Sequence, residues 1–325
     1  MEALVGTFDD AVLASSWDAI HANDPHATPF QTRAWLQGWH RMLGEGGQLV
    51  VRVFCDAGQA IGAVAEVVAA DGSRTLAGGR DVTDYRGPIG APAHRRAIAK
   101  AWVAVLAAEG VSEVDLHGIP TDTGWLDALE AADAELLDRA REDVCPVVSL
   151  HGGWEGYLEH VDRHQRREHE RKVRRLGREV GPVEVVQAQP GDLEAAVERF
   201  LAMAVESAGD KGGFFADPSM RDFFRGIVAE MAPTGVLRLH ELVVGGIPAA
   251  SMVSLVADGE WGLYNSAFDA SLEAWGPGSI LVWELIRIAA QEECRVFDLL
   301  RGDEPYKYRF GARDRVIEHA LLRPA

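Results

Sequence analysis

A glycine turn between a strand and an apolar helix is the feature that most constrains the fold of this chain. The predicted elements are a strand EWGLYNSAF (260–268), a turn GPGS (276–279), a helix ILVWELIRIAAQEEC (280–294) and a strand RVFDLL (295–300). Glycines at the start of a helix allow several backbone N–H groups to point at one place, and the positive end of the helix dipole adds to their field. Because both effects favour a bound anion, this stretch predicts a cradle for a pyrophosphate.

A polar run follows the second of these strands immediately. It reads RGDEPYKYRFGA (301–312) and gathers acidic, phenolic and basic side chains within a few residues. Side chains of these kinds transfer protons between reacting groups. A phosphate cradle beside a proton-transfer site indicates a transferase that uses a donor of the acyl-CoA type.

Length, charge and cysteine content narrow the class of protein further. A chain of 325 residues suits two domains of about 150 residues each. The formal charge of −18 argues against a general DNA- or RNA-binding protein and against adsorption to anionic membranes. No apolar run reaches the ~18 residues of a membrane span, and the acidic N-terminus lacks a secretion signal. The three cysteines are widely separated, so the sequence predicts no disulfide framework and no metal site, and we expect a cytoplasmic protein.

Helices and strands alternate in the first half of the chain, which is typical of a mixed α/β domain. The predicted helices and strands are 10–23, 30–44, 94–110 and 123–133, and 48–57, 61–70, 111–119 and 143–150, respectively.

A long charged helix, 154–180, is predicted next, and Gly-Pro at 181–182 ends it. The two halves of the chain share a rough order of elements, which hints at a duplicated fold. In the second half, the predicted strands are 183–187, 236–244, 247–257 and 260–268, and the predicted helices are 191–209 and 217–232.

The order of elements in 183–300 resembles the fold of the GNAT acyltransferases. In that family the pyrophosphate loop reads Gln/Arg-x-x-Gly-x-Gly/Ala at the start of a helix, and the corresponding residues here are Glu273, Gly276 and Gly278. The glycines fit, whereas Glu273 replaces the usual Gln or Arg. The resemblance implies that acetyl-CoA or another acyl-CoA binds as co-substrate without a metal. The donor-binding residues that it implies are Phe268, Gly276, Gly278, Ser279 and Ile280.

The tail 297–312 is similar to the signature of the CelD/BcsL-type acetyltransferases, which carry a BioF-like acetyltransferase domain. Its segment YKYRFG (306–311) also resembles the Phe-Lys-x-x-Phe-Gly segment of the Fem-type peptidyltransferases, and TDY (83–85) resembles an N-terminal element of the first group. Both groups consist of two GNAT-like halves.

We therefore expect an α/β fold of two tandem GNAT-like domains, each a mixed, mostly antiparallel sheet flanked by helices. The predicted boundaries are an acceptor-side domain at 1–152, a linking basic helix at 153–182 and an acyl-CoA-binding domain at 183–325.

Acyl transfer from a thioester to an amine gives the tail residues their predicted roles. Tyr306 is the candidate that protonates the departing thiolate, with Tyr308 as the alternative. Asp303 and Glu304 are placed to accept a proton, and the resemblance to Fem-type enzymes implies charge stabilisation by Lys307.

The remaining predicted contacts lie on strands and loops. A backbone N–H between Ser266 and Phe268 would meet the oxyanion. The residues predicted to contact the acceptor are Asp84, Tyr85, Tyr264 and Asn265.

The predicted function is an N-acyltransferase in which a small-molecule or peptide amine attacks acyl-CoA directly in a ternary complex. Only Cys294 approaches the predicted site, and it ends the helix away from the glycine turn, so no acyl-enzyme is predicted. A Fem-type aminoacyltransferase that uses aminoacyl-tRNA is one alternative. A degenerate GNAT-like binding module is another. The sequence does not identify the acceptor, the acyl chain length or the oligomeric state.

A basic stripe on the charged helix leaves two interpretations open. It could hold an anionic substrate, the phosphates of CoA or an RNA end, or it could be a solvated surface paired with Glu168, Glu170 and Glu179. The arginines of the stripe are Arg163, Arg167, Arg171, Arg174 and Arg178.

Overall fold

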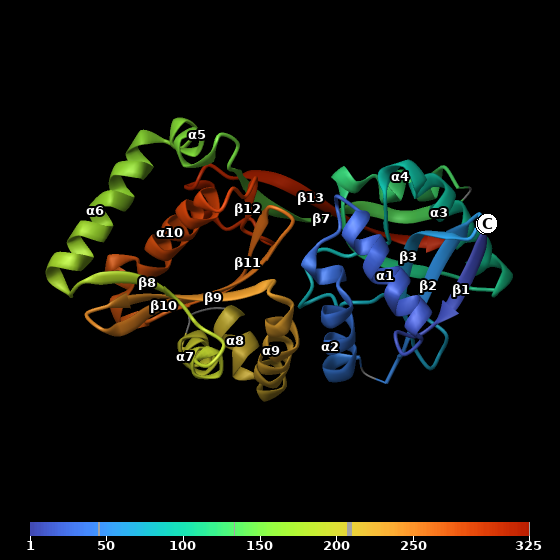
Figure 1. Cartoon of the computed structure of the whole chain (residues 1–325), viewed down its shortest axis with the longest axis horizontal. Coiled ribbons are helices and arrows are strands. Elements are labelled where there is room, and N and C mark those ends of the chain that lie inside the picture. Colours follow the sequence, from blue (N-terminus) through green and yellow to red (C-terminus); the bar gives the residue numbers. More distant parts are fainter. Residues whose placement is uncertain (45, 133, 207–209, 325) are drawn as a thin grey trace. The chain divides into compact units, whose positions relative to one another are not determined.

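The computed structural model describes residues 1–44, 46–132, 134–206 and 210–324 (Figure 1). The chain divides into two compact units. Unit 1 comprises Met1–Cys145 and the residues from Arg315 onward, and unit 2 comprises Pro146–Asp314. Among the described residues, no helix is long and apolar enough to cross a membrane.

The sheet of unit 1 is antiparallel except at one pair of strands. Its order is β1-β2-β3-β4-β6-β13, with the first part of β7 beside β13 and β5 beside β3. The strands β4 and β6 are parallel, since a helix crosses over between them. The strands are β1 (Glu2–Gly6), β2 (Gln48–Asp56), β3 (Gln59–Val68), β4 (Arg74–Leu76), β5 (Ile89–Gly90), β6 (Val114–Pro120), β7 (Glu135–Ser149) and β13 (Arg313–Arg323).

Helices cover the sheet of unit 1 and bury large side chains against it. Trp102 and Trp125, from two of these helices, join Phe54 of β2 in one hydrophobic cluster. The helices are α1 (Ala11–Asn23), η1 (Pro29–Gln31), α2 (Arg33–Leu43), η2 (Pro92–His94), α3 (Arg95–Ala108), η3 (Thr121–Thr123) and α4 (Trp125–Glu130), where η marks a 3₁₀ helix.

The part of the sheet in unit 2 is also mostly antiparallel. Its order is β8-β9-β10-β11-β12, followed by the end of β7, and only β11 and β12 are parallel. The strands are β8 (Val183–Gln187), β9 (Leu237–Val244), β10 (Ile247–Ala257), β11 (Glu260–Phe268) and β12 (Val296–Asp298).

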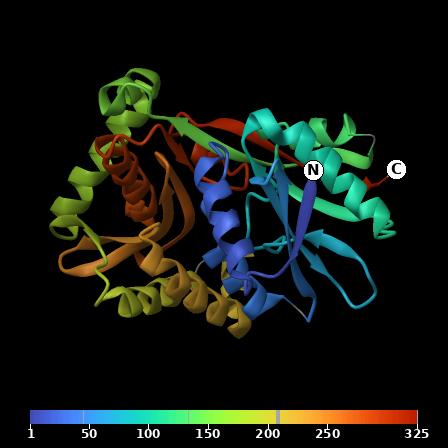
Figure 2. The same cartoon turned by 45° about the vertical axis from the view of Figure 1, so that its right-hand side comes forward.

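The helices of unit 2 cover its sheet on both faces (Figures 1 and 2). The helix α10 packs on one face of β9–β11, and α7 packs on the other. The helices are α5 (Gly153–His160), α6 (Arg163–Glu179), α7 (Leu193–Val205), α8 (Asp210–Ala216), α9 (Pro218–Met231), η4 (Ala232–Thr234), η5 (Ala270–Trp275), α10 (Pro277–Gln291) and α11 (Pro305–Tyr308).

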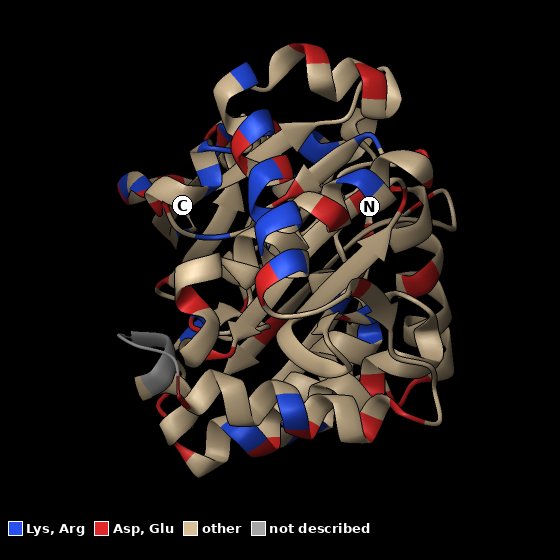
Figure 3. Ribbon diagram, turned by 90° about the vertical axis from the view of Figure 1, so that its left-hand side faces the viewer, with Lys and Arg blue, Asp and Glu red and all other residues tan. Residues whose placement is uncertain are grey.

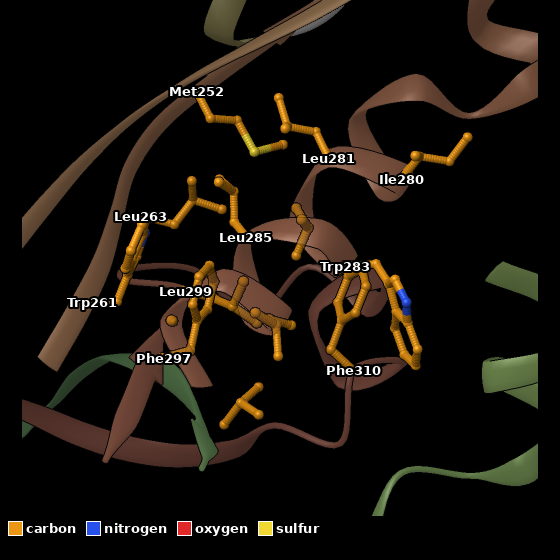
Figure 4. Packing of buried hydrophobic residues seen from close by; sticks show 14 of the residues in the cluster. Met252, Trp261, Leu263, Ile280, Leu281, Trp283, Leu285, Phe297, Leu299 and Phe310 are labelled. Carbon is orange, nitrogen blue, oxygen red and sulfur yellow. The ribbon is translucent and has the colours of Figure 1, made fainter. Parts of the chain in front are cut away.

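The apolar side of α10 forms the centre of the core of unit 2 (Figure 4). Leu281 and Leu285 are fully buried with Met252 of β10 and Trp261 of β11. Each such side chain stabilises the fold by about 1.5–3 kcal/mol relative to exposure. This packing fixes the start of α10 at the end of β11.

The long helix predicted at 154–180 is two helices in the structure, α5 and α6. Val161 between them is extended, with φ −74° and ψ 139°. Asp162 then caps α6, because its carboxylate accepts hydrogen bonds from the N–H groups of His164 and Gln165. The predicted end at Gly181–Pro182 is correct within two residues.

Residues 207–209 of the helix predicted at 191–209 lie outside the described residues, as does residue 133 of the helix predicted at 123–133. The domain boundaries at 152 and 183 stay a prediction. In the structure α6 lies within unit 2, and the chain from Arg315 onward lies within unit 1.

Candidate functional site

The sheet of unit 2 opens along β11. Among the described residues, the register between β11 and β12 covers only Glu260–Gly262 against Val296–Asp298. The rest of β11 continues beside β10 alone, as far as Phe268. The end of β11 therefore has one edge that β12 does not cover.

Backbone groups of β11 point toward this edge. The Asp269 N–H donates to the carbonyl of Ala249 of β10 at 3.0 Å. Along an antiparallel pair, successive residues direct their N–H groups alternately toward the partner strand and away from it. The N–H groups of Ser266 and Phe268 consequently face away from β10. A bulge at Tyr264, opposite Val253 and Ser254 of β10, bends β11 just before this point.

The predicted glycine turn lies against the end of β11. Gly276 caps α10 with φ 66°, a left-handed conformation that favours glycine. A Cβ atom on Gly278 would lie 3.4 Å from Cδ1 of Phe268, which places the turn against the ring. The structure thus brings the predicted residues Phe268, Gly276 and Gly278 together.

The hydrogen bonds of α10 show which backbone N–H groups of its first turn have no acceptor within the helix. Pro277 has no N–H, and the Ile280 N–H donates to the Gly276 carbonyl at 3.1 Å. Gly278 and Ser279 lie between them, in the part of a helix whose N–H groups have no intrahelical acceptor. These two N–H groups and the positive end of α10 correspond to the predicted anion cradle, and binding of an anion there stays a prediction. The Ile280 side chain, also predicted to contact the donor, is buried in the core.

Lys172 of α6 lies over the same turn, and the sequence interpretation did not include it. A Cβ atom on Gly276 would lie 3.4 Å from its Nζ and 3.7 Å from its Cδ and Cε. The buried residues His169 and Leu176 mark the face of α6 that packs on the rest of unit 2. Their helical spacing is the sequence signal that could have indicated Lys172.

Tyr306 lies on the short helix α11, after β12. Its side chain is 37% exposed. Partial burial of the hydroxyl, and then the nearby Glu304 carboxylate, raise the pKa of Tyr306 above its usual range. The hydroxyl is therefore protonated at neutral pH, as a proton donor must be.

Lys307 is buried and holds the turn before α11. Its Nζ donates to the carbonyls of Leu300, Arg301 and Gly302 at 2.9, 2.6 and 3.0 Å, and it pairs with Glu304 at 2.9 Å. Leu300 has φ 55°, a strained conformation that these bonds stabilise. This geometry favours a positioning role, and the direct contact with substrate expected of Lys307 stays a prediction.

The other tail candidates differ in their surroundings. Asp303 is exposed. The Tyr308 hydroxyl donates to Asp314 at 2.8 Å, so Tyr308 is held on the protein surface by a carboxylate.

Comparison with known proteins shows which fold this arrangement belongs to. Residues 163–308 match a family model described as an acetyltransferase (GNAT) domain. The fold of the chain is similar to that of FemX, with 11% identity and a TM-score of 0.66 over 98% of this chain and 97% of that chain. The protein has a GNAT-superfamily, Fem-related fold.

Two further solved structures share the GNAT fold over the whole chain. One is the C-terminal domain of a putative lysylphosphatidylglycerol synthetase from Agrobacterium fabrum, with 12% identity and a TM-score of 0.59 over 97% of this chain and 92% of that chain. The other is a tandem GNAT protein from the clavulanic acid biosynthesis pathway, with 13% identity and a TM-score of 0.50 over 99% and 97%. No curated protein matches the chain by sequence. The predicted tandem GNAT arrangement is confirmed.

The acceptor residues predicted in the first GNAT unit are held by its core. Tyr85 is 3% exposed, with the Arg315 guanidinium over its ring at 5.5 Å. Thr83 is buried and accepts a hydrogen bond from the Trp35 indole at 2.9 Å. Asp84 between them is half-buried. Tyr85 thus packs as a core residue, and a contact with substrate stays a prediction for both Asp84 and Tyr85.

The acceptor residues predicted in the second GNAT unit lie on the bent part of β11. Tyr264 and Asn265 are half-buried, and the Tyr264 ring stacks with Phe224 of α9 at 6.3 Å. Their contact with an acceptor also stays a prediction.

Most charged side chains of the basic helix α6 are exposed. Figure 3 shows Lys and Arg along this helix, interspersed with Asp and Glu. Three arginines of the predicted stripe pair with acids of the same helix, namely Arg171 with Glu168 at 2.7 Å, Arg174 with Glu170 at 4.0 Å and Arg178 with Glu179 at 3.2 Å. Arg163 and Arg167 have no acidic partner among the described residues. A solvated surface therefore accounts for part of the stripe. No group of three metal-ligating side chains gathers anywhere in the described ranges.

Proposed function

We propose that this protein is an acyltransferase that transfers an acyl group from acyl-CoA to a primary amine. The observation that carries this proposal is the start of α10 against the open end of β11, within the stretch 163–308 that matches the GNAT model. The Gly278 and Ser279 N–H groups would bind the pyrophosphate of the donor.

The proposed reaction is direct attack of the amine on the thioester. The amine nitrogen bonds to the carbonyl carbon, and the carbon–sulfur bond breaks after a tetrahedral intermediate. The oxyanion is met by an N–H of β11, at Ser266 or Phe268, which faces the uncovered edge. The amine proton leaves through water to Asp303, because Glu304 is already paired with Lys307.

Tyr306 supplies the last proton in this scheme. Its hydroxyl protonates the departing thiolate and is later restored from solvent.

A Fem-type aminoacyltransferase that uses aminoacyl-tRNA is the second candidate. The similarity to FemX over 98% of the chain favours it, together with the exposed Arg163 and Arg167 on α6. The formal charge of −18 counts against binding of a polyanion.

Binding measurements on the whole protein distinguish these candidates. A ligand at 100 times its dissociation constant stabilises the fold by about 2.7 kcal/mol, so thermal unfolding with CoA, acetyl-CoA and longer acyl-CoAs gives a clear shift under the first proposal. Filter binding of charged tRNA at two salt concentrations tests the second. Tight, salt-dependent tRNA binding without a shift by any acyl-CoA would reverse their order.

A further inference from the structure

The turn before α10 supplies no cation of its own. Residues 269–279 contain no Lys or Arg, and their acids are Asp269 and Glu273. Glu273 is exposed, and its carbonyl accepts the Gly276 N–H at 2.9 Å. The backbone of Glu273 is thus part of the turn, and its negative charge disfavours an anion nearby.

Lys172 brings a cation to this turn from a different helix. The last atoms of its side chain lie over Gly276, with Nζ nearest. The residue is half-buried, so its side chain follows the surface of unit 2. In sequence the two residues are about a hundred positions apart, and only the packing of α6 joins them.

Aromatic contacts fix the position of α6 at this point. His169, one turn before Lys172, stacks between Trp283 at 4.6 Å and Phe310 at 5.0 Å. One turn after Lys172, Arg175 lies over the Trp275 ring at 5.9 Å, and the Trp275 indole donates to Glu179 at 3.2 Å. These contacts hold the backbone of Lys172 beside the start of α10.

The charges around Lys172 are unbalanced in the protein alone. An ammonium group at the positive end of a helix is unfavourable. Among the described residues, no carboxylate forms a salt bridge with Lys172. The Glu168 carboxylate attracts Lys172 at longer range, but it is paired with Arg171 at 2.7 Å. Arg166 and Arg175 of the same helix are paired as well. Burial, and then the positive charges of Lys172 and Arg309, lower the pKa of His169 to about 4, so His169 adds no charge at neutral pH. An anion at the turn would relieve the repulsion between ammonium and helix.

We propose that Lys172 binds the pyrophosphate of the acyl donor and supplies the cation that the turn itself lacks. This inference rests on the proposed function. It assigns to α6 a part in donor binding that does not depend on its exposed arginines.

Calorimetry with CoA on Lys172→Met tests the proposal. We expect CoA affinity to fall roughly tenfold, the usual effect of losing one charge-assisted contact. Lys100→Met is the matched control, because Lys100 is an exposed lysine of α3 and the change in net charge is the same. It should leave CoA affinity unchanged. Acetyl-pantetheine, which has no pyrophosphate, should bind the Lys172→Met variant as it binds the wild type.

A second variant distinguishes charge from structure. Glu273→Arg places a cation in the turn itself, so it should restore CoA affinity when combined with Lys172→Met. Thermal unfolding of each variant without ligand checks that the fold is intact. If Lys172→Met unfolds, Lys172→Gln takes its place in the same titration.

Each outcome has a distinct meaning. If wild type binds no CoA, the proposed function is wrong. If wild type binds CoA and Lys172→Met binds it equally well, only the inference about Lys172 is wrong. Equal losses for CoA and acetyl-pantetheine, or no restoration by Glu273→Arg, would also overturn it, because either result indicates a structural role.

Discussion

The two GNAT units repeat one backbone path and differ where a strand crosses over to its parallel neighbour. In unit 1, β4 leads through α3 to β6, and in unit 2, β11 leads through α10 to β12. The connection before the helix runs over 77–94 in unit 1 and only over 269–276 in unit 2. The longer connection carries Tyr85 into the core, whereas the shorter one ends in the glycine cap of α10.

The cations beside the two helix starts differ in the same way. Arg95 begins α3, is 6% exposed and pairs with Asp24 at 3.0 Å. Its guanidinium also donates to the carbonyls of Gly90 and Thr123. Lys172 beside α10 has no such partner in the described part of the chain. The comparison teaches that a shared backbone path does not imply a shared site. A carboxylate pairs with the cation beside the helix start in unit 1, whereas in unit 2 we propose that the cation binds a ligand.

The largest expected effect concerns Tyr306 of unit 2, the proposed proton donor. Tyr306→Phe removes one hydroxyl, so kcat should fall by roughly 10²–10⁴ with little change in CoA affinity. Tyr308→Phe is the matched control, since its hydroxyl is bound to Asp314 and should matter little to turnover. Steady-state kinetics with an amine acceptor measure both. Near-wild-type turnover of Tyr306→Phe, with a fall in Tyr308→Phe, would move the acid to Tyr308.

The buried histidine of unit 2 should make the protein sensitive to acid. The pKa of His169 is lowered to about 4, chiefly by burial, against about 6.5 in an unfolded chain. The unfolded state then binds more protons, so stability is full above pH ~6.5 and falls as the pH drops toward 4. His169→Phe keeps an aromatic ring in the stack but has no group that titrates there. The loss of unfolding free energy on acidification should therefore be smaller by on the order of 3 kcal/mol. Denaturant unfolding at pH 7 and pH 4 measures it, and equal acid losses in variant and wild type would contradict it.

The glycine cap of α10 should show a specific effect on affinity. Gly276→Ala and Gly124→Ala each place a side chain at a left-handed helix cap, with φ 66° and 67°. Both should cost about 1–2 kcal/mol of stability. Only Gly276→Ala should weaken CoA binding, by roughly tenfold, because it shifts the N–H groups of the cradle. Thermal unfolding and calorimetry compare the two. A similar CoA affinity in both variants would contradict the proposal that the start of α10 binds the donor.

The smallest expected effect concerns His117 of unit 1. Its contribution to stability changes with pH in the direction opposite to that of His169. His117 pairs with Asp115 at 2.8 Å and Glu142 at 3.3 Å, and hydrogen bonds to these carboxylates raise the pKa of His117. Its contribution to stability is full below pH ~6.5 and is lost as the pH rises through the folded pKa. The difference in stability between wild type and His117→Gln should therefore shrink as the pH rises. Thermal unfolding between pH 6 and pH 9 checks this, and a difference that grows with pH would be inconsistent with it.

Local patterns allowed the donor side of the site to be predicted. Phe268, Gly276 and Gly278 belong to one strand–turn–helix segment, so their proximity follows from chain connectivity. The break between α5 and α6 was missed because the charged pattern continues through it. Asp162 before Arg163 was the available signal, since aspartate favours the N-cap position.

The surroundings of the residues in the tail 297–312 could not be predicted from the sequence in the same way. The sequence predicts charge stabilisation by Lys307, and the structure adds that its ammonium group is buried against the carbonyls of residues 300–302. An ammonium group forms such bonds only where the backbone curls around it, and the strained Leu300 gives no sequence signal. The pKa shift of Tyr306 likewise depends on burial that the sequence does not state.

The sequence by itself determined most of the strands and helices and the glycine turn, although it did not predict the strands β1 and β13. These features depend on periodicity and on short-range backbone chemistry, which neighbouring residues fix. The tertiary structure decided which side chains surround the turn. It placed Lys172 over Gly276, stacked His169 between Trp283 and Phe310, and opened β11 beyond β12. Such contacts join segments far apart in the chain, and packing alone selects them.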